Sequence, residues 1–142
     1  MKTVKQIDLT LINKPGQLYL VSDMLGENKI NIIACYFTSQ EKEVNFHFIA
    51  SDPDKAINVL KTAGYKIGTK EVIACEIPSH PGGLTAVLRL LKDVDINIDY
   101  IYSCFGTGNT TVVIIGVDPV DKALKVMEDN WIRVLGSDLY HI

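Results

Sequence analysis

Two short segments with the same order of residue types are the places where binding chemistry is most readily expected. One is Asn13-Lys14-Pro15-Gly16-Gln17-Leu18 and the other, 66 residues later, is Ser79-His80-Pro81-Gly82-Gly83-Leu84. Each follows an apolar run and precedes apolar residues at helical spacing, which predicts a strand, a tight turn and a helix start. Proline presets φ for such a turn, and glycine lets a backbone or a ligand approach closely. The N–H groups that a helix start leaves unpaired can hold an anion such as a carboxylate.

Polar side chains flank both turns. Asn13 and Ser79 occupy matching positions, and each can donate and accept hydrogen bonds, which suits a zwitterionic ligand. The alternative is that they cap the following helix or shape the turn, as Asn and Ser often do. Lys14 and His80 also match in position but not in type. We expect Lys14 in solvent and regard His80 as a candidate pocket residue.

A second matched pair, Asn31 and Asn97, opens the strand that follows each of these helices. Each stands between isoleucines, and asparagine is not a favoured strand residue. One interpretation is a turn-forming asparagine after Lys29 or Asp95. The other, contact with a ligand, comes from the resemblance described below.

Motifs for catalysis or metal binding are not found in the sequence. His47, His80 and His141 fall in a predicted strand, a turn and the C-terminal tail, without the spacing of metal ligands. There is no G-x-S-x-G segment, and the glycines of Gly106-Thr107-Gly108-Asn109 lie in a hairpin turn where a phosphate-binding loop would need a following lysine and helix. We therefore expect no enzyme activity, no cofactor and no metal.

Composition excludes further classes. Hydrophobic residues make up 47% and charged residues 22%, as in an ordinary globular protein, and the net charge is -3. The 14 Lys and Arg are scattered among 17 acids, so we expect no nucleic-acid partner. The apolar runs are too short to span a membrane and no signal peptide is evident, which predicts a cytoplasmic protein. Three cysteines without C-x-x-C spacing, Cys35, Cys75 and Cys104, are expected to be reduced and buried.

The chain contains an internal repeat. The first half predicts the order β-α-β-β-α-β, with strands near residues 7–12, 31–37, 44–50 and 65–67, and the second half repeats it from Lys70. At an offset of 66, 13 of the 47 positions from 7 to 53 are identical, whereas ordinary residue usage gives about 3 by chance. One inserted residue after Pro53 then changes the offset to 67. We predict two modules, residues 1–69 and 70–142, which bury surface against each other because about 70 residues are marginal alone.

Two features of the second module have no counterpart in the first. Residues 137–142 align with the start of a third copy, which predicts an extra C-terminal strand paired to a sheet edge. The run Val112 to Ile115 is apolar on both alternating faces, whereas Asn45 and His47 make one face of its counterpart more polar. Helices are expected to cover one face of this strand. A second subunit is a candidate to cover the other face.

The repeat and its motifs resemble a known family. Two β-α-β-β-α-β modules, each with Pro-Gly-x-Leu after its first strand and Ile-Asn-Ile at the start of its second, are similar to tandem ACT domains, which are small amino-acid-sensing regulatory modules. The resemblance covers essentially the whole chain. It implies an α+β fold of two ferredoxin-like modules, paired side by side in one antiparallel sheet with helices on one face. It also implies that a free amino acid binds at the interface between modules.

The function that follows is a free-standing sensor that regulates a separate, unidentified enzyme or transporter. The ligand carboxylate is expected on backbone amides at Gly16-Gln17-Leu18 or Gly82-Gly83-Leu84, the ammonium group near Asn13 or Ser79, and Asn97 or Asn31 in contact from the other module. We expect a homodimer or a larger homo-oligomer. The alternative function is an interaction or oligomerisation module that binds no ligand.

Overall fold

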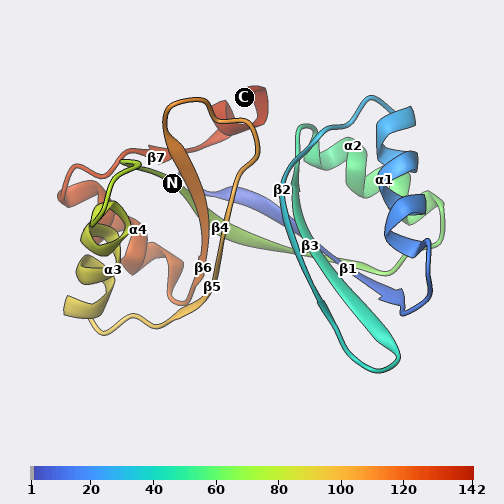
Figure 1. The fold of residues 1–142 in the computed structure, drawn as a ribbon, viewed down its shortest axis with the longest axis horizontal. Coiled ribbons are helices and arrows are strands. Elements are labelled where there is room, and N and C mark those ends of the chain that lie inside the picture. The colour runs from blue at the N-terminus through green and yellow to red at the C-terminus, as the bar shows by residue number, and fades with distance from the viewer. Residues whose placement is uncertain (1) are drawn as a thin grey trace. The chain divides into compact units, whose positions relative to one another are not determined.

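The computed structural model describes residues 2–142 and divides into two compact units. The first unit is Lys5–Lys70, and the second unit is Glu71–Ile142 together with residues 2–4. Each unit is a small antiparallel sheet with two helices on one face (Figure 1). The α+β fold of ferredoxin-like modules predicted from the sequence is therefore confirmed.

The first unit follows the predicted order of elements. Its elements are β1 (Val4–Ile12), α1 (Gln17–Glu27), β2 (Ile32–Ser39), β3 (Glu43–Ala50), α2 (Pro53–Thr62) and the start of β4 (Ile67–Ile77). Strand β3 pairs antiparallel with both β1 and β2, with Leu9 opposite Phe46 and Cys35 opposite Phe48. Because side chains alternate across a strand, Leu9 and Phe48 point to the helix face, where they pack with Leu25 of α1 in the core.

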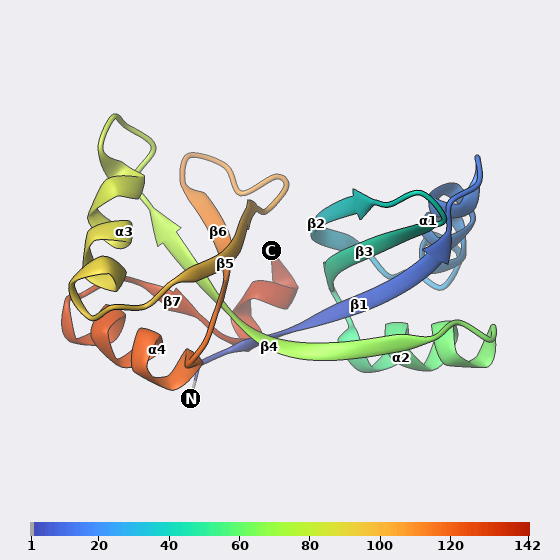
Figure 2. The same ribbon diagram turned by 90° about the horizontal axis from the view of Figure 1, so that it is seen from below.

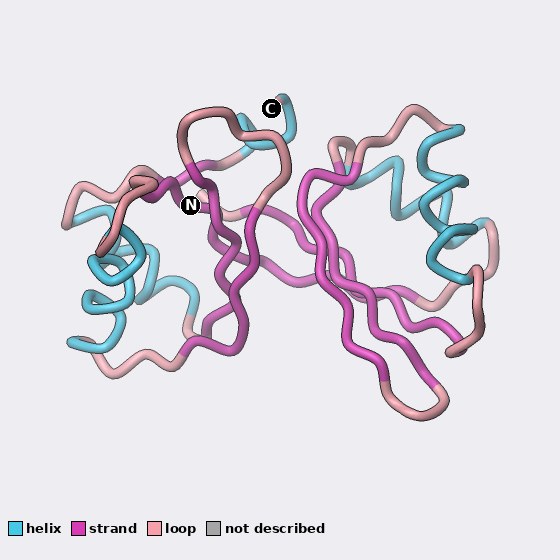
Figure 3. The backbone as a smooth tube through the Cα atoms, viewed as in Figure 1, coloured by secondary structure: helices cyan, strands magenta, loops and turns pink. Residues whose placement is uncertain are grey.

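The second unit repeats this arrangement. Its helices and remaining strands are α3 (Gly83–Asp93), β5 (Ile98–Ser103), β6 (Thr111–Val117), α4 (Val120–Asp129) and β7 (Val134–Leu135). Strand β4 pairs with β6 and β7, and β6 pairs with β5. The core on the helix face joins Ile73 and Ile115 of the sheet to Leu91 of α3 and Met127 of α4. Figure 3 shows the loop between β5 and β6, which is longer than the hairpin between β2 and β3.

One strand belongs to both copies of the repeat. The sequence predicts a short strand at residues 65–67 and a separate one from Val72, but β4 is continuous from Ile67 to Ile77 and appears as one long arrow in Figure 2. The division between the units falls inside it, between Lys70 and Glu71. The segment Gly68-Thr69-Lys70 holds no helix start or proline that would interrupt the extended backbone.

The predicted extra C-terminal strand is wrong. Residues Ser137–His141 form a 3₁₀ helix, η1, after the two-residue strand β7. The Gly136 N–H donates to Asp138 Oδ1 at 2.8 Å, a local turn that competes with an extended strand. Leu139 is then fully buried, so the turn is also fixed by apolar packing.

Strand pairing in the two units corrects the position predicted for the inserted residue of the repeat. Ile7 lies opposite Phe48, and Ile73 lies opposite Ile115. Ile7 and Ile73 differ by 66, but Phe48 and Ile115 differ by 67. The extra residue of the second copy is therefore in the loop before β6, not after Pro53 as the identities suggested.

The apolar strand β6 is buried on both faces. Val113 and Ile115 belong to the core on the helix side, and Val112 and Ile114 on the other side are buried as well. Asp138 of η1 and the C-terminal Ile142 line a cavity together with Val112, so the C-terminal segment lies beside this second face. An exposed apolar face on β6 no longer supports an oligomer, and the homodimer remains a prediction.

Candidate functional site

Both Pro-Gly segments form the predicted strand, turn and helix start. Gly16 and Gly82 are the N-cap residues of α1 and α3, with φ of 88° and 87°. This left-handed conformation is open to glycine and strained for most other residues. Neither helix has a side-chain cap, so the alternative that Asn13 and Ser79 cap the helices is wrong.

Each helix start presents backbone N–H groups to solvent. The turns close on themselves, since the Gly83 N–H donates to the His80 carbonyl at 3.0 Å and the Gln17 N–H donates to the Lys14 carbonyl at 3.4 Å. Within residues 2–142, no hydrogen bond is made by the next two amides of either helix, Leu18 and Tyr19 in α1 and Leu84 and Thr85 in α3. These amides are the donors that an anion would use.

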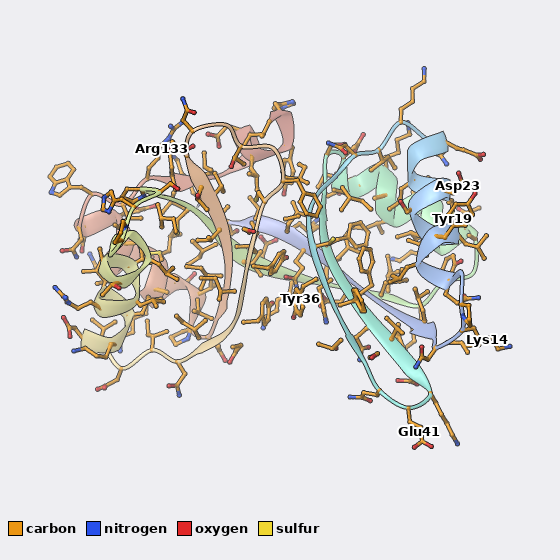
Figure 4. All side chains as sticks on the ribbon, in the orientation of Figure 1. Lys14, Tyr19, Asp23, Tyr36, Glu41 and Arg133 are labelled. Atoms are coloured by element: carbon orange, nitrogen blue, oxygen red, sulfur yellow. The ribbon has the colours of Figure 1, made fainter. Side chains whose placement is uncertain are left out.

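The polar side chains at the turns are only partly available. Asn13 Nδ2 donates to the Gln40 carbonyl at 3.1 Å, which leaves its Oδ1 for a ligand. His80 Nδ1 lies 2.9 Å from the Pro81 carbonyl oxygen, and His80 and Ser79 are both exposed. Lys14 is exposed, as expected, at the turn before α1 (Figure 4). The roles of Asn13, Ser79 and His80 in binding remain predictions.

Asn31 and Asn97 lie at the other end of the helices from the turns. An eleven-residue helix, about 16 Å long at 1.5 Å per residue, separates Asn97 from the turn of its own unit. The left-handed residues are Lys29 and Asp95, so the asparagines do not form the turn themselves. The backbone N–H of Asn31 donates to Ser51 Oγ at 2.8 Å, and Asn97 lines a cavity of about 510 Å³ at the C-terminal end of α3. Within one unit, the structure therefore does not bring these asparagines to the turns.

A groove that the sequence did not reveal runs beside the second turn. We call it the Trp131 groove; its volume is about 440 Å³. Most of its lining is apolar and includes Pro78, Gly83, Ala86, Val87, Trp131 and Ile132. The three polar lining residues are Glu76, Thr110 and Arg133. An apolar hollow with a few polar groups at its rim is the usual form of a small-molecule site.

Glu76 and Arg133 are held together at the rim of this groove. Arg133 Nη1 lies 3.0 Å from Glu76 Oε2, and the Glu76 N–H donates to the Arg133 carbonyl at 2.9 Å. Figure 4 shows Arg133 at the edge of the second unit. The same pair also lines a neighbouring cavity of about 500 Å³, bounded by Val112, Asp138 and Ile142.

The first unit carries a polar cluster on the face of its sheet that the helices leave free. Asp8 Oδ1 accepts a hydrogen bond from Gln6 Nε2 at 2.7 Å and lies 2.7 Å from His47 Nδ1. The Tyr36 ring stacks on the His47 ring with centroids 4.5 Å apart, and Tyr36 points away from the helices in Figure 4. The polar alternation along β1 and β3 is the signal that could have predicted this cluster.

Burial makes the cysteines poor nucleophiles. It raises the pKa of Cys75 to about 12 and that of Cys104 to about 11, and it also raises the pKa of Cys35. All three are free thiols, with Cys75 buried and the other two half-buried. A protonated thiol is a poor nucleophile and a poor metal ligand. The prediction of buried cysteines is confirmed for Cys75 and is wrong for Cys35 and Cys104, which are only half-buried.

Within the described residues, no group of three or more His, Cys, Asp or Glu could hold a metal ion. No helix among them has the length and the apolar character needed to cross a membrane.

Comparisons with known proteins agree with the internal repeat. The model of the ACT domain pair family matches residues 2–140, so the chain belongs to this family. ACT domains are regulatory modules, and their pairing in one chain matches the two units described above.

Solved structures extend this comparison. A protein from Bacteroides thetaiotaomicron is 32% identical, with a TM-score of 0.93 over 99% of this chain and 98% of that one. The regulatory subunits of aspartate kinase from Thermus thermophilus and Thermus flavus share the fold at 17% and 16% identity. Their TM-scores are 0.61 and 0.57; the matches cover 92% and 91% of this chain and 93% of each subunit. No curated protein matches.

Proposed function

We propose that this protein is a sensor that binds a free amino acid at its Pro-Gly turns and regulates a separate enzyme or transporter. The observation that carries the proposal is the pair of helix starts, each with a left-handed glycine and two amides without a partner in the described structure. Membership of the ACT domain pair family supports it, because these modules typically bind amino acids for regulation.

The geometry suits the carboxylate of the ligand. Amides at a helix start replace the water lost from an anion, and the helix dipole adds about 0.3–1 kcal/mol. The ammonium group is assigned to Asn13 Oδ1 at the first turn or to Ser79 at the second. A second module would complete the site with Asn31 or Asn97, which is the part of the proposal that the resemblance implies.

Regulation follows if the ligand has different affinities for two arrangements of the modules. A ligand can shift an equilibrium only by its differential affinity for the two states. The Thermus proteins with this fold are subunits that regulate aspartate kinase, which supports action on a separate protein here.

An interaction module without a ligand is the second candidate. The observation that favours it is a set of exposed large apolar side chains, among them Tyr19 on α1 and Trp131, which is 94% exposed. Exposed aromatics of this kind are common at protein interfaces.

Amide NMR tests whether a bound amino acid lies at the Pro-Gly turns. Titration of the ¹⁵N-labelled protein with an amino acid that binds is expected to move the N–H signals of Leu84 and Thr85, or of Leu18 and Tyr19, more than those of helix interiors. The signal of Leu124 in α4, which is buried in the core, serves as the internal control. A ligand that binds while all four turn amides stay unmoved would place the carboxylate elsewhere.

A further inference from the structure

The repeat itself shows that the Trp131 groove is particular to the second unit. At matched positions the first unit has Gln17 and Leu20 where the second has Gly83 and Ala86. Gly83 is required, because a Cβ there would overlap the Pro78 carbonyl oxygen. Small residues at these two positions line the groove beside the first turn of α3, whereas the matching residues of α1 have larger side chains.

Trp131 borders this space in a conformation that a bulky residue rarely adopts. It follows α4 with a φ of 64°, in the position where Gly64, with a φ of 90°, follows α2. The backbone turn is the same, since Tyr65 bonds back to Leu60 and Ile132 bonds back to Met127. Glycine is the usual residue here. A tryptophan in its place, 94% exposed, is strained and contributes little burial to the fold.

The charged pair at the rim has unused bonding capacity. Glu76 is fixed by its side-chain and backbone bonds to Arg133, and its side chain is 20% exposed. Glu76 lies opposite Val112 in the sheet, so its side chain points to the face away from the helices. Of the pair, Arg133 is therefore the one that can serve a ligand in the groove, because a guanidinium has five donors and its bond to Glu76 does not use all of them. Thr10 and Lys66 stand at the matching positions in the first unit, which therefore lacks the acid.

We propose that the second unit selects an amino acid with an apolar side chain, branched or aromatic, and that the Trp131 groove is its specificity pocket. The proposal rests on the proposed function, since the carboxylate lies on the Leu84 and Thr85 amides. Ser79 of the turn holds the ammonium group, and Arg133 lies at the rim of the groove. The side chain of the ligand lies over Ala86, Val87 and Ile132, with the Trp131 ring as a flexible wall.

The first test compares the affinities of different amino acids and uses a substitution that fills the groove. Calorimetry with L-leucine and L-phenylalanine is expected to show binding about tenfold or more tighter than with L-serine and L-aspartate. Ala86→Leu installs the residue of the first unit at an exposed position, so the fold should tolerate it, and it should lower the affinity for leucine about tenfold. The matched control Leu20→Ala changes the corresponding position of α1 and should leave that affinity unchanged.

The second test separates binding from stability. Trp131→Gly installs the residue of the first unit and is expected to raise the melting temperature, because it removes the strained φ. The same variant is expected to weaken leucine binding several-fold. A residue with only a structural role would not give effects of opposite sign.

The outcomes distinguish the two proposals. If no amino acid binds, the proposed function fails and the specificity pocket fails with it. If serine or aspartate binds as tightly as leucine, or if Ala86→Leu binds leucine like the parent, the sensor function stands and the specificity pocket is wrong.

Discussion

Gly83→Ala is expected to lower the free energy of unfolding by about 3 kcal/mol or more, the largest stability effect that we predict for a single methyl group. The added Cβ would overlap a backbone atom, the Pro78 carbonyl oxygen, which cannot rotate away as a side chain would. Either the segment that leads into the turn or the first turn of α3 must move. Urea unfolding, followed by circular dichroism, measures the loss.

The repeat supplies the control for this prediction. Gln17 holds the matching position at the start of α1 and already carries a Cβ, so Gln17→Ala should change stability by less than about 0.5 kcal/mol. The contrast tests whether the close approach is specific to the second unit. Equal stabilities for Gly83→Ala and the parent would show that the Pro78 carbonyl is not as close to α3 as described.

Gly82→Val is expected to abolish measurable binding of the amino acid at the second turn and to cost about 1–2 kcal/mol of stability. The expected loss of stability does not come from a steric clash, because a Cβ at Gly82 would meet no atom within 4 Å. The cost comes from φ, which is 87° and unfavourable for a β-branched residue. Relief of this strain rotates the peptide and moves the Leu84 and Thr85 amides away from the carboxylate.

Gly82→Asn is the control, because asparagine tolerates the left-handed conformation. It should retain the turn and bind within about tenfold of the parent. The same pair of changes at Gly16, where φ is 88°, reports on the first turn separately. If Gly82→Val and Gly16→Val both fold and bind like the parent, the turns are structural only and the proposed site is wrong.

The sequence predicted the parts of the fold that depend on local chemistry. Pro-Gly pairs, apolar periodicity and the Asp52-Pro53 start of α2 each involve residues that are near one another in the sequence. The structure confirms the elements that these signals indicate. The Asp52 side chain accepts from the Lys55 N–H at 3.2 Å, as its position before a proline suggests. Because the modules repeat, each helix expected in the first module was also expected at the matching place in the second.

The features that were missed depend on contacts between distant residues. The tail aligned with a strand, but the burial of Leu139 and the Asp138 turn make it a 3₁₀ helix. The Trp131 groove joins residues near 78, 86 and 131, which no local pattern connects. Comparison of the two copies carried a signal, since Trp131 stands where the first copy has Gly64, but only the structure shows that the substitution borders a hollow.

Calorimetry of the parent protein against each of the twenty amino acids tests the central claim most directly. The account predicts saturable heat with at least one of them, with the protein folded by circular dichroism throughout. The amino acids with branched or aromatic apolar side chains are the expected ligands. A folded protein that gives no binding heat with any of the twenty would contradict the account and would favour an interaction module.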